Sequence, residues 1–278
     1  MKDLKYKLVV SDFDGTLTPS FYTLVDETTE AIKRYREAGG KFALCTGRPV
    51  SDTSKVLGAG GLECDAVCYS QGAIVHVNGK TVLDAGIDKD LAHDIISLVE
   101  SKWQRKYLVY VDNTMYYTPN TPDVTEHVQF FVDNGGEGVL VDDILDCVKT
   151  VKGSMTKFII IKGRTEDVSE VTKLILDNFG DKVIVNSGHP CFLEVISNKY
   201  TKGTATRLIA KELGIDEKDV LTIGDSTNDV EMVKFGFGVA VGSGSDAVKK
   251  IAKHIAPPVM EKPVKYVIDK ILNGENFD

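Results

Sequence analysis

The chain has 278 residues, of which 42% are hydrophobic and 27% are charged, and we detect neither repeats nor low-complexity tracts. This composition excludes the disordered and fibrous classes, and the length favours two domains. Lysines and arginines number 33 against 41 aspartates and glutamates, so the net charge is −8. Such an acidic chain disfavours general affinity for nucleic acid or an anionic membrane, and we expect neither partner.

Targeting signals and cysteine patterns bear on where the protein acts and on whether it contains disulfides or zinc. The first residues lack the apolar stretch of a signal peptide, and no run of about 18 apolar residues occurs. We therefore expect a cytoplasmic protein. The five cysteines are odd in number, scattered and without a CxxC pair, which favours buried thiols over disulfides or zinc ligation.

The first segment, from residue 7 to about residue 83, alternates between strand and helix patterns. Its apolar run at 8–11 is typical of a buried parallel strand. The later elements predicted in this segment are a helix capped by Asp26 and ended by Gly39-Gly40, a strand at 41–45, a short helix containing Val56 and Leu57, a strand at 66–68, and a hairpin turned by Asn78-Gly79.

The regular alternation of strand and helix patterns is interrupted between about residues 84 and 186. The elements predicted there are a helix from Asp88, strands at 107–111 and 115–117, a helix opened by Thr121-Pro122, a strand at 158–161, a helix through 168–175 ended by Gly180, and a strand at 183–185. This order predicts an inserted α+β domain with its own sheet.

Alternation resumes at about residue 187. The predicted elements are strands at 192–196, 220–223 and 237–241 and helices at 203–213 and 264–272. The predicted domains are therefore a core made of residues 1–83 and 187–278 and an inserted domain at 84–186.

Two carboxylates, Asp12 and Asp14, follow the first strand, at the edge where open α/β sheets bind ligands. Charges this close would repel unless a cation lay between them, and oxygen ligands together with substrate phosphate favour Mg²⁺. Asp-x-Asp before Gly is a weak signal alone, because these residues are common in turns. Three further segments carry polar groups suited to a phosphate: Thr46-Gly47-Arg48, Lys202-Gly203, and Gly224-Asp225-Ser226-Thr227-Asn228-Asp229.

These four elements, in this order, resemble the haloacid dehalogenase superfamily of phosphohydrolases, and the inserted domain resembles the type-two cap of its Cof-like IIB branch. The resemblance covers essentially the whole chain, by motifs in the core and by architecture in the cap. It implies a three-layer Rossmann-like α/β core with a parallel sheet plus an inserted α+β cap. It also implies Mg²⁺-dependent hydrolysis of a small phosphate monoester, of the sugar phosphate, nucleotide or pyridoxal phosphate class, through an aspartyl-phosphate.

The resemblance assigns catalytic roles to four residues. Asp12 would attack phosphorus, and Asp14 would act as general acid and base, with its backbone carbonyl contacting the metal. Thr46 would donate a hydrogen bond to a phosphoryl oxygen, and Lys202 would supply positive charge to the transition state. Taken singly, Thr46 could instead be a helix N-cap and Lys202 a solvated surface lysine.

The resemblance also implies ligands for the metal and the substrate. Asp225 resembles the principal metal carboxylate, whereas Asp229 would bind metal or orient Lys202. Asn228 would bond the phosphate or a metal-bound water, or serve only as a cap. The expected metal set is thus Asp12, Asp14, Asp225 and Asp229, and the expected substrate-binding set is Thr46, Gly47, Lys202 and Asn228. Arg48 remains open between a salt bridge and a substrate contact.

The chain departs from the branch pattern at two places. Gln71-Gly72-Ala73 stands where Asn-Gly-Ala is usual, and Glu261-Lys262-Pro263-Val264 replaces an acidic-Gly-Val stretch. Two alternative functions stay open: a phosphomutase-type phosphotransferase, and a non-catalytic phosphometabolite-binding protein on the same fold. The sequence identifies neither the physiological substrate, nor the cap residues that select it, nor the oligomeric state.

Overall fold

The computed structural model describes residues 4–19, 24–118, 122–189 and 191–277. The chain folds into two compact units. The first contains Met1–Pro49, Thr53–Leu83 and Thr201–Asp278, and the second contains Val50–Asp52 and Asp84–Tyr200. No helix among the described residues is long and apolar enough to cross a membrane.

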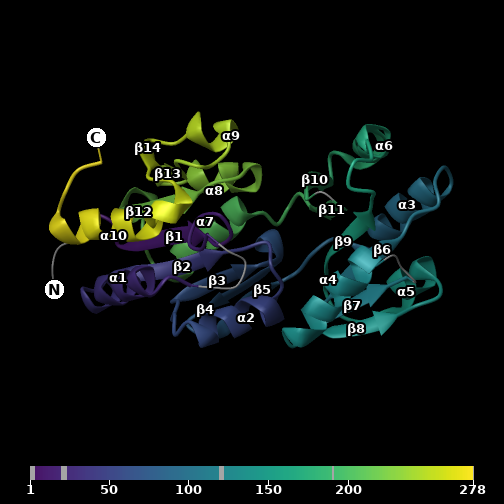
Figure 1. Cartoon of the computed structure of the whole chain (residues 1–278), viewed down its shortest axis with the longest axis horizontal. Coiled ribbons are helices and arrows are strands. Elements are labelled where there is room, and N and C mark those ends of the chain that lie inside the picture. Colours follow the sequence, from purple (N-terminus) through teal and green to yellow (C-terminus); the bar gives the residue numbers. More distant parts are fainter. Residues whose placement is uncertain (1–3, 20–23, 119–121, 190, 278) are drawn as a thin grey trace. The chain divides into compact units, whose positions relative to one another are not determined.

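The first unit is built on an eight-stranded sheet in the order β14-β13-β12-β1-β2-β3-β4-β5 (Figure 1). The six strands from β14 to β3 pair in parallel, and β4 is antiparallel to β3. The strands are β1 (Leu8–Asp12), β2 (Lys41–Cys45), β3 (Ala66–Tyr69), β4 (Ile74–Val77), β5 (Lys80–Asp84), β12 (Val220–Gly224), β13 (Phe237–Val241) and β14 (His254–Ala256).

Helices cover both faces of this sheet, which gives the three layers expected of a Rossmann-like core. The helices α7, α8 and α9 pack on the face that carries Leu8, Val10 and Ala43. The helices α1 and α10 lie together on the other side. The bounds are α1 (Asp26–Glu37), α2 (Val50–Ala59), α7 (Lys202–Glu212), α8 (Val230–Val233), α9 (Asp246–Lys249) and α10 (Pro263–Asn273).

One predicted cap is wrong. Val25, not Asp26, occupies the N-cap of α1, and no side chain bonds to a free N–H there. Asp26 lies in the first turn instead, where its negative charge interacts favourably with the positive end of the helix dipole. The sequence alone does not distinguish the N-cap from the first turn, because aspartate is common at both positions.

The second unit has a six-stranded mixed sheet in the order β10-β11-β9-β6-β7-β8. The helices α3, α5 and α6 cover one face of it, and α4 packs on the other. The elements are α3 (Lys89–Glu100), β6 (Tyr107–Val111), β7 (Thr114–Tyr117), α4 (Pro122–Asp133), β8 (Glu137–Leu140), α5 (Ile144–Thr150), β9 (Met155–Ile161), α6 (Ser169–Phe179), β10 (Val183–His189) and β11 (Phe192–Ser197). Thr121, expected to open α4, lies outside the described residues.

The strand predicted at 192–196 belongs to this second sheet and not to the core. As β11 it pairs antiparallel with both β10 and β9. The second unit therefore continues to Tyr200, past the predicted boundary at residue 186. The error has a physical cause: a buried strand is apolar in either sheet, so its pattern does not reveal its neighbours. The sequence pattern also did not predict β8 and α5, because both are short and only partly apolar.

Candidate active site

The proposed catalytic segments meet at one edge of the first sheet. The strands β12, β1 and β2 are adjacent and parallel, so their carboxyl ends lie side by side. Asp12 is the last residue of β1 and pairs in register with Cys45, the last residue of β2. Thr46 follows β2 directly, and Asp225 follows β12 directly. The strand order itself therefore gathers these three residues.

Lys202 lies buried between two carboxylates. Its Nζ donates to Asp12 Oδ1 at 2.5 Å and to Asp229 Oδ1 at 2.7 Å, and the residue is only 2% exposed. Burial alone would lower the pKa of Lys202, but the two carboxylates outweigh it and raise the pKa. Lys202 is the first residue of α7, where the helix dipole disfavours a cation. The carboxylates, rather than the helix, hold the ammonium in place, and it is not a solvated surface lysine.

Three carboxylates form a tight group beside this lysine. Oxygens of Asp12, Asp225 and Asp229 all lie within 4.8 Å of one another. Burial raises the pKa of Asp12 well above its usual range, and the charges of Asp229 and Asp225 raise it further. Burial and Asp229 also raise the pKa of Asp225. When all three carboxylates are ionised, the one ammonium leaves two negative charges uncompensated, which suits a divalent cation that prefers oxygen ligands.

Asp229 is largely occupied by its protein contacts. One oxygen accepts from Lys202, and the other accepts from the backbone N–H groups of Asp225 at 3.0 Å and Ser226 at 2.9 Å. A carboxylate has about four acceptor sites, and three of them are used by these bonds. Of the two roles left open by the sequence, these contacts favour the orientation of Lys202 and of the Asp225 backbone over direct metal binding.

Thr16 contributes a contact that the sequence did not single out. Its Oγ1 donates to Asp225 Oδ1 at 2.9 Å, and the residue is 1% exposed. The threonine hydroxyl thus orients the carboxylate from the loop after β1. In the sequence Thr16 indicates only a turn, and its position four residues after Asp12 is the one available signal.

Asp14 forms a bidentate pair with Arg48. Arg48 Nε donates to Asp14 Oδ2 at 2.8 Å and Nη2 donates to Oδ1 at 2.5 Å, while the guanidinium lies 4.8 Å from the ring centre of Phe13. Of the two interpretations of Arg48, this geometry favours the salt bridge, with the proposed acid–base residue as its partner. The Asp14 side chain is not part of the close carboxylate group found among the described residues.

Neither Thr46 nor Asn228 serves as a helix cap. Thr46 is fully buried, and its Oγ1 accepts from Arg48 N at 3.1 Å, which leaves its hydroxyl hydrogen available for donation. The N-cap of α2 is Pro49, not Thr46. Asn228 lies inside a 3₁₀ turn, Thr227–Asp229, whose capping box is formed by Ser226 and Asp229. The capping alternatives for Thr46 and Asn228 therefore lose their support.

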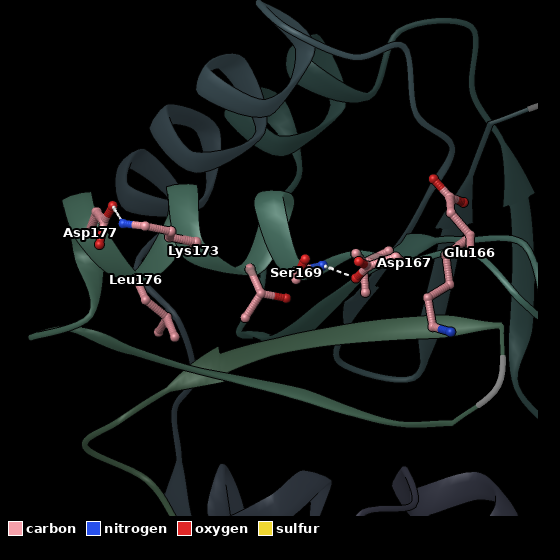
Figure 2. Close-up of a pocket in the computed structure, with 9 residues that line it drawn as sticks. Glu166, Asp167, Ser169, Lys173, Leu176 and Asp177 are labelled. Carbon is pink, nitrogen blue, oxygen red and sulfur yellow. Dashed lines mark hydrogen bonds and ion pairs between the residues drawn. The ribbon is translucent and has the colours of Figure 1, made fainter.

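A separate hollow of about 590 Å³ lies on the second unit, along α6. Figure 2 shows Lys173 directed toward Asp177 and Asp167 beside Ser169. Lys173 and Asp177 are 2.5 Å apart, and Asp167 Oδ1 accepts from Ser169 N at 2.8 Å. These charged groups satisfy one another locally, which is typical of a solvated surface.

Comparison with known proteins defines the class. The model of the haloacid dehalogenase-like hydrolase family matches residues 9–268. Phosphatase YwpJ from Bacillus subtilis is 26% identical, over 96% of this chain and 100% of that protein. The 5-amino-6-(5-phospho-D-ribitylamino)uracil phosphatase YitU of the same organism is 25% identical, over 90% and 92% of the two chains.

Solved structures share the fold of this chain. A haloacid dehalogenase-like hydrolase from Bacteroides thetaiotaomicron superposes with a TM-score of 0.80 at 22% identity, over 96% of this chain and 100% of that one. The family match defines a hydrolase, and the fold is an α/β core with an inserted type-two cap. The chain belongs to the haloacid dehalogenase-like hydrolase family, in its Cof-like branch.

Proposed function

We propose that this protein is a Mg²⁺-dependent phosphomonoester phosphatase that works through an aspartyl-phosphate. The observation that carries the proposal is the buried Lys202 ammonium shared by Asp12 and Asp229, beside Asp225. A buried charge cluster of this kind is a poor source of stability, because desolvation offsets much of the attraction. We therefore assign the cluster a catalytic role at the sheet edge where ligands bind.

The side chains have distinct roles in this proposal. Asp12 attacks phosphorus and splits hydrolysis into two easier displacements. Lys202 and the Thr46 hydroxyl stabilise the negative charge on the phosphoryl oxygens, with Gly47 and Asn228 completing the phosphate contacts. Asp14 protonates the leaving alcohol and later takes a proton from the attacking water.

The donor set fits a divalent cation. The carboxylates of Asp12 and Asp225 and the backbone carbonyl of Asp14 would hold Mg²⁺, with Asp229 behind them. When bound, the ion would neutralise excess carboxylate charge and polarise phosphoryl oxygens. The donors are all oxygens, so Mg²⁺ suits them better than a metal that selects thiolate or imidazole.

The substrate class that we propose is a small phosphorylated metabolite: a sugar phosphate, a nucleotide or pyridoxal phosphate. The name of YitU describes a phosphatase for a small phosphorylated compound, which supports this size class. A cytoplasmic site of action would match such substrates.

The direct test is release of inorganic phosphate from a metabolite panel with Mg²⁺ present. We expect turnover of several monoesters, loss of turnover with EDTA, and recovery when Mg²⁺ is added in excess. A phosphotransferase would instead move the phosphoryl group to an added sugar acceptor without free phosphate. A binding protein would retain the ligand without turnover across the whole panel, and either result would contradict the hydrolase proposal.

Arg48 offers a sharper test of the role of Asp14. In Arg48→Lys the bidentate grip is lost, since an ammonium does not reproduce the guanidinium fork. General acid catalysis contributes about 10²–10⁴-fold, and partial misplacement of Asp14 should lose about tenfold in kcat/KM for an alkyl phosphate. The loss for p-nitrophenyl phosphate should be much smaller, because its leaving group needs no proton. Equal losses on both substrates would argue against an acid that Arg48 positions.

A further inference from the structure

The turn after β3 has an unusual backbone. Ser70, Gln71 and Gly72 have φ values of 48°, 63° and 119°, so three consecutive residues adopt positive φ. Two of them carry side chains, for which this conformation is uncommon and strained. Gln71 is also 7% exposed. Such strain persists only where surrounding contacts enforce it, and it is found most often at functional sites.

The turn contacts the segments that carry the proposed phosphate ligands. Gln71 N donates to Thr46 O at 3.0 Å, and the Gln71 amide packs so closely on Gly47 that a Cβ there would lie 2.5 Å from Gln71 Nε2. A Cβ on Gly72 would lie 2.4 Å from the carbonyl oxygen of Thr201, the residue before Lys202. The backbone of this turn therefore fits against both the loop after β2 and the start of α7.

The Gln71 side chain reaches a third segment. Its Oε1 accepts from Asn228 Nδ2 at 3.0 Å, although β3 and β12 are separated in the sheet by β1 and β2. On the other side of the same amide, Ser226 Oγ donates to Asn228 Oδ1. These two bonds fix the plane of the Asn228 amide and use one of its two Nδ2 hydrogens. The second hydrogen has a set direction as a result.

We propose that Gln71 is a positioning residue for phosphate binding, acting through Asn228; this inference rests on the proposed function of the site. Gln71 holds the Asn228 amide so that its remaining N–H is presented to a phosphate oxygen. The chain has glutamine where its branch usually has asparagine, and the side chain of glutamine that bonds to Asn228 is one methylene longer than that of asparagine. The strained backbone is the cost of placing that side chain over Gly47.

The experiment measures the binding of inorganic phosphate by calorimetry with Mg²⁺ present. It also measures KM and kcat for a phosphate monoester that the wild-type protein hydrolyses. Gln71→Met removes the hydrogen bond while keeping the side-chain length, and Gln129→Met makes the same change on the exposed face of α4 as a control. One hydrogen bond of about 1 kcal/mol predicts a three- to tenfold rise in the phosphate Kd and in KM for Gln71→Met. We expect kcat to stay within about twofold, because the bond acts on binding.

A double-mutant cycle separates positioning from general loop damage. Asn228→Ala should weaken phosphate binding by at least as much as Gln71→Met, and the double variant should be no weaker than Asn228→Ala alone. Multiplicative effects of the two changes would overturn the inference, as would an unchanged Kd in Gln71→Met.

A second variant covers the case in which Gln71→Met fails to fold. Asparagine tolerates a left-handed backbone but is one methylene too short, so Gln71→Asn should fold and show the same rise in Kd. A wild-type Kd in Gln71→Asn would overturn the inference. Binding is read without turnover, so a wild-type protein that binds phosphate but releases none from any ester would count against the proposed function and not against the role of Gln71.

Discussion

Asp12→Asn should abolish phosphate release, with kcat lower by at least about 10³-fold, as expected when a covalent nucleophile is removed. The amide has nearly the shape of the carboxylate, and its oxygen can still accept from Lys202 Nζ, which lies 2.5 Å from Asp12 Oδ1. It cannot form the acyl phosphate. Substrate and Mg²⁺ binding should survive in weakened form, so the loss should fall on kcat. The measurement is a phosphate-release assay at saturating substrate.

The same variant should not be less stable than the wild type when metal is absent. Asp12 is one of three crowded carboxylates, and burial together with Asp229 and Asp225 raises its pKa. Replacing one of the three with a neutral amide relieves repulsion, and the Lys202 ammonium keeps its buried ion pair with Asp229, so we expect an equal or higher melting temperature with EDTA. Asp177→Asn, at an exposed ion pair on α6, is the matched control and should leave kcat unchanged. Residual activity in Asp12→Asn above a few per cent would refute the nucleophile assignment.

The gathering of Asp12, Thr46 and Asp225 could be predicted from the sequence for a simple reason. Each follows an apolar run typical of a parallel strand, and parallel strands place their carboxyl ends at one edge. The alternation of strand and helix indicated an α/β core on the same basis, whereas the three layers were implied by the family resemblance. Local patterns suffice where the fold requires one direction for all strands.

Contacts set by side-chain rotamers could not be predicted in this way. The pairing of Arg48 with Asp14 and the bond from Thr16 to Asp225 join residues 34 and 209 positions apart. No periodicity encodes such pairs, because they depend on how two loops face each other after folding. The Gln71 departure and Asn228 were both visible in the sequence, but the hydrogen bond between them was not. The sheet membership of β11 was missed because burial on both faces looks alike in either sheet.

Lys202→Met should damage both activity and stability, and the two effects have separable causes. The loss of the ammonium removes positive charge from the phosphoryl transition state, and we expect kcat to fall by about 10²–10³-fold, as for other electrostatic stabilisers. In the folded protein, the substitution also leaves the carboxylates of Asp12 and Asp229 buried without their shared partner. Breaking a buried ion pair from one side costs about 3–5 kcal/mol of unfolding free energy. Urea unfolding with EDTA present measures this term.

Two further variants distinguish the causes. Lys7→Met removes one half of an exposed pair with Asp219 and should change the unfolding free energy by less than about 1 kcal/mol. Adding Asp229→Asn to Lys202→Met removes one of the stranded charges, so part of the lost stability should return while kcat stays low. If the double variant recovered activity as well, Lys202 would matter only by shielding Asp229, and its contact with Asp12 would have no catalytic meaning. If Lys202→Met were as stable as the wild type, the proposed buried ion pairs of Lys202 with Asp12 and Asp229 would be contradicted. Two ionised carboxylates that are buried without a cation carry a large free-energy cost.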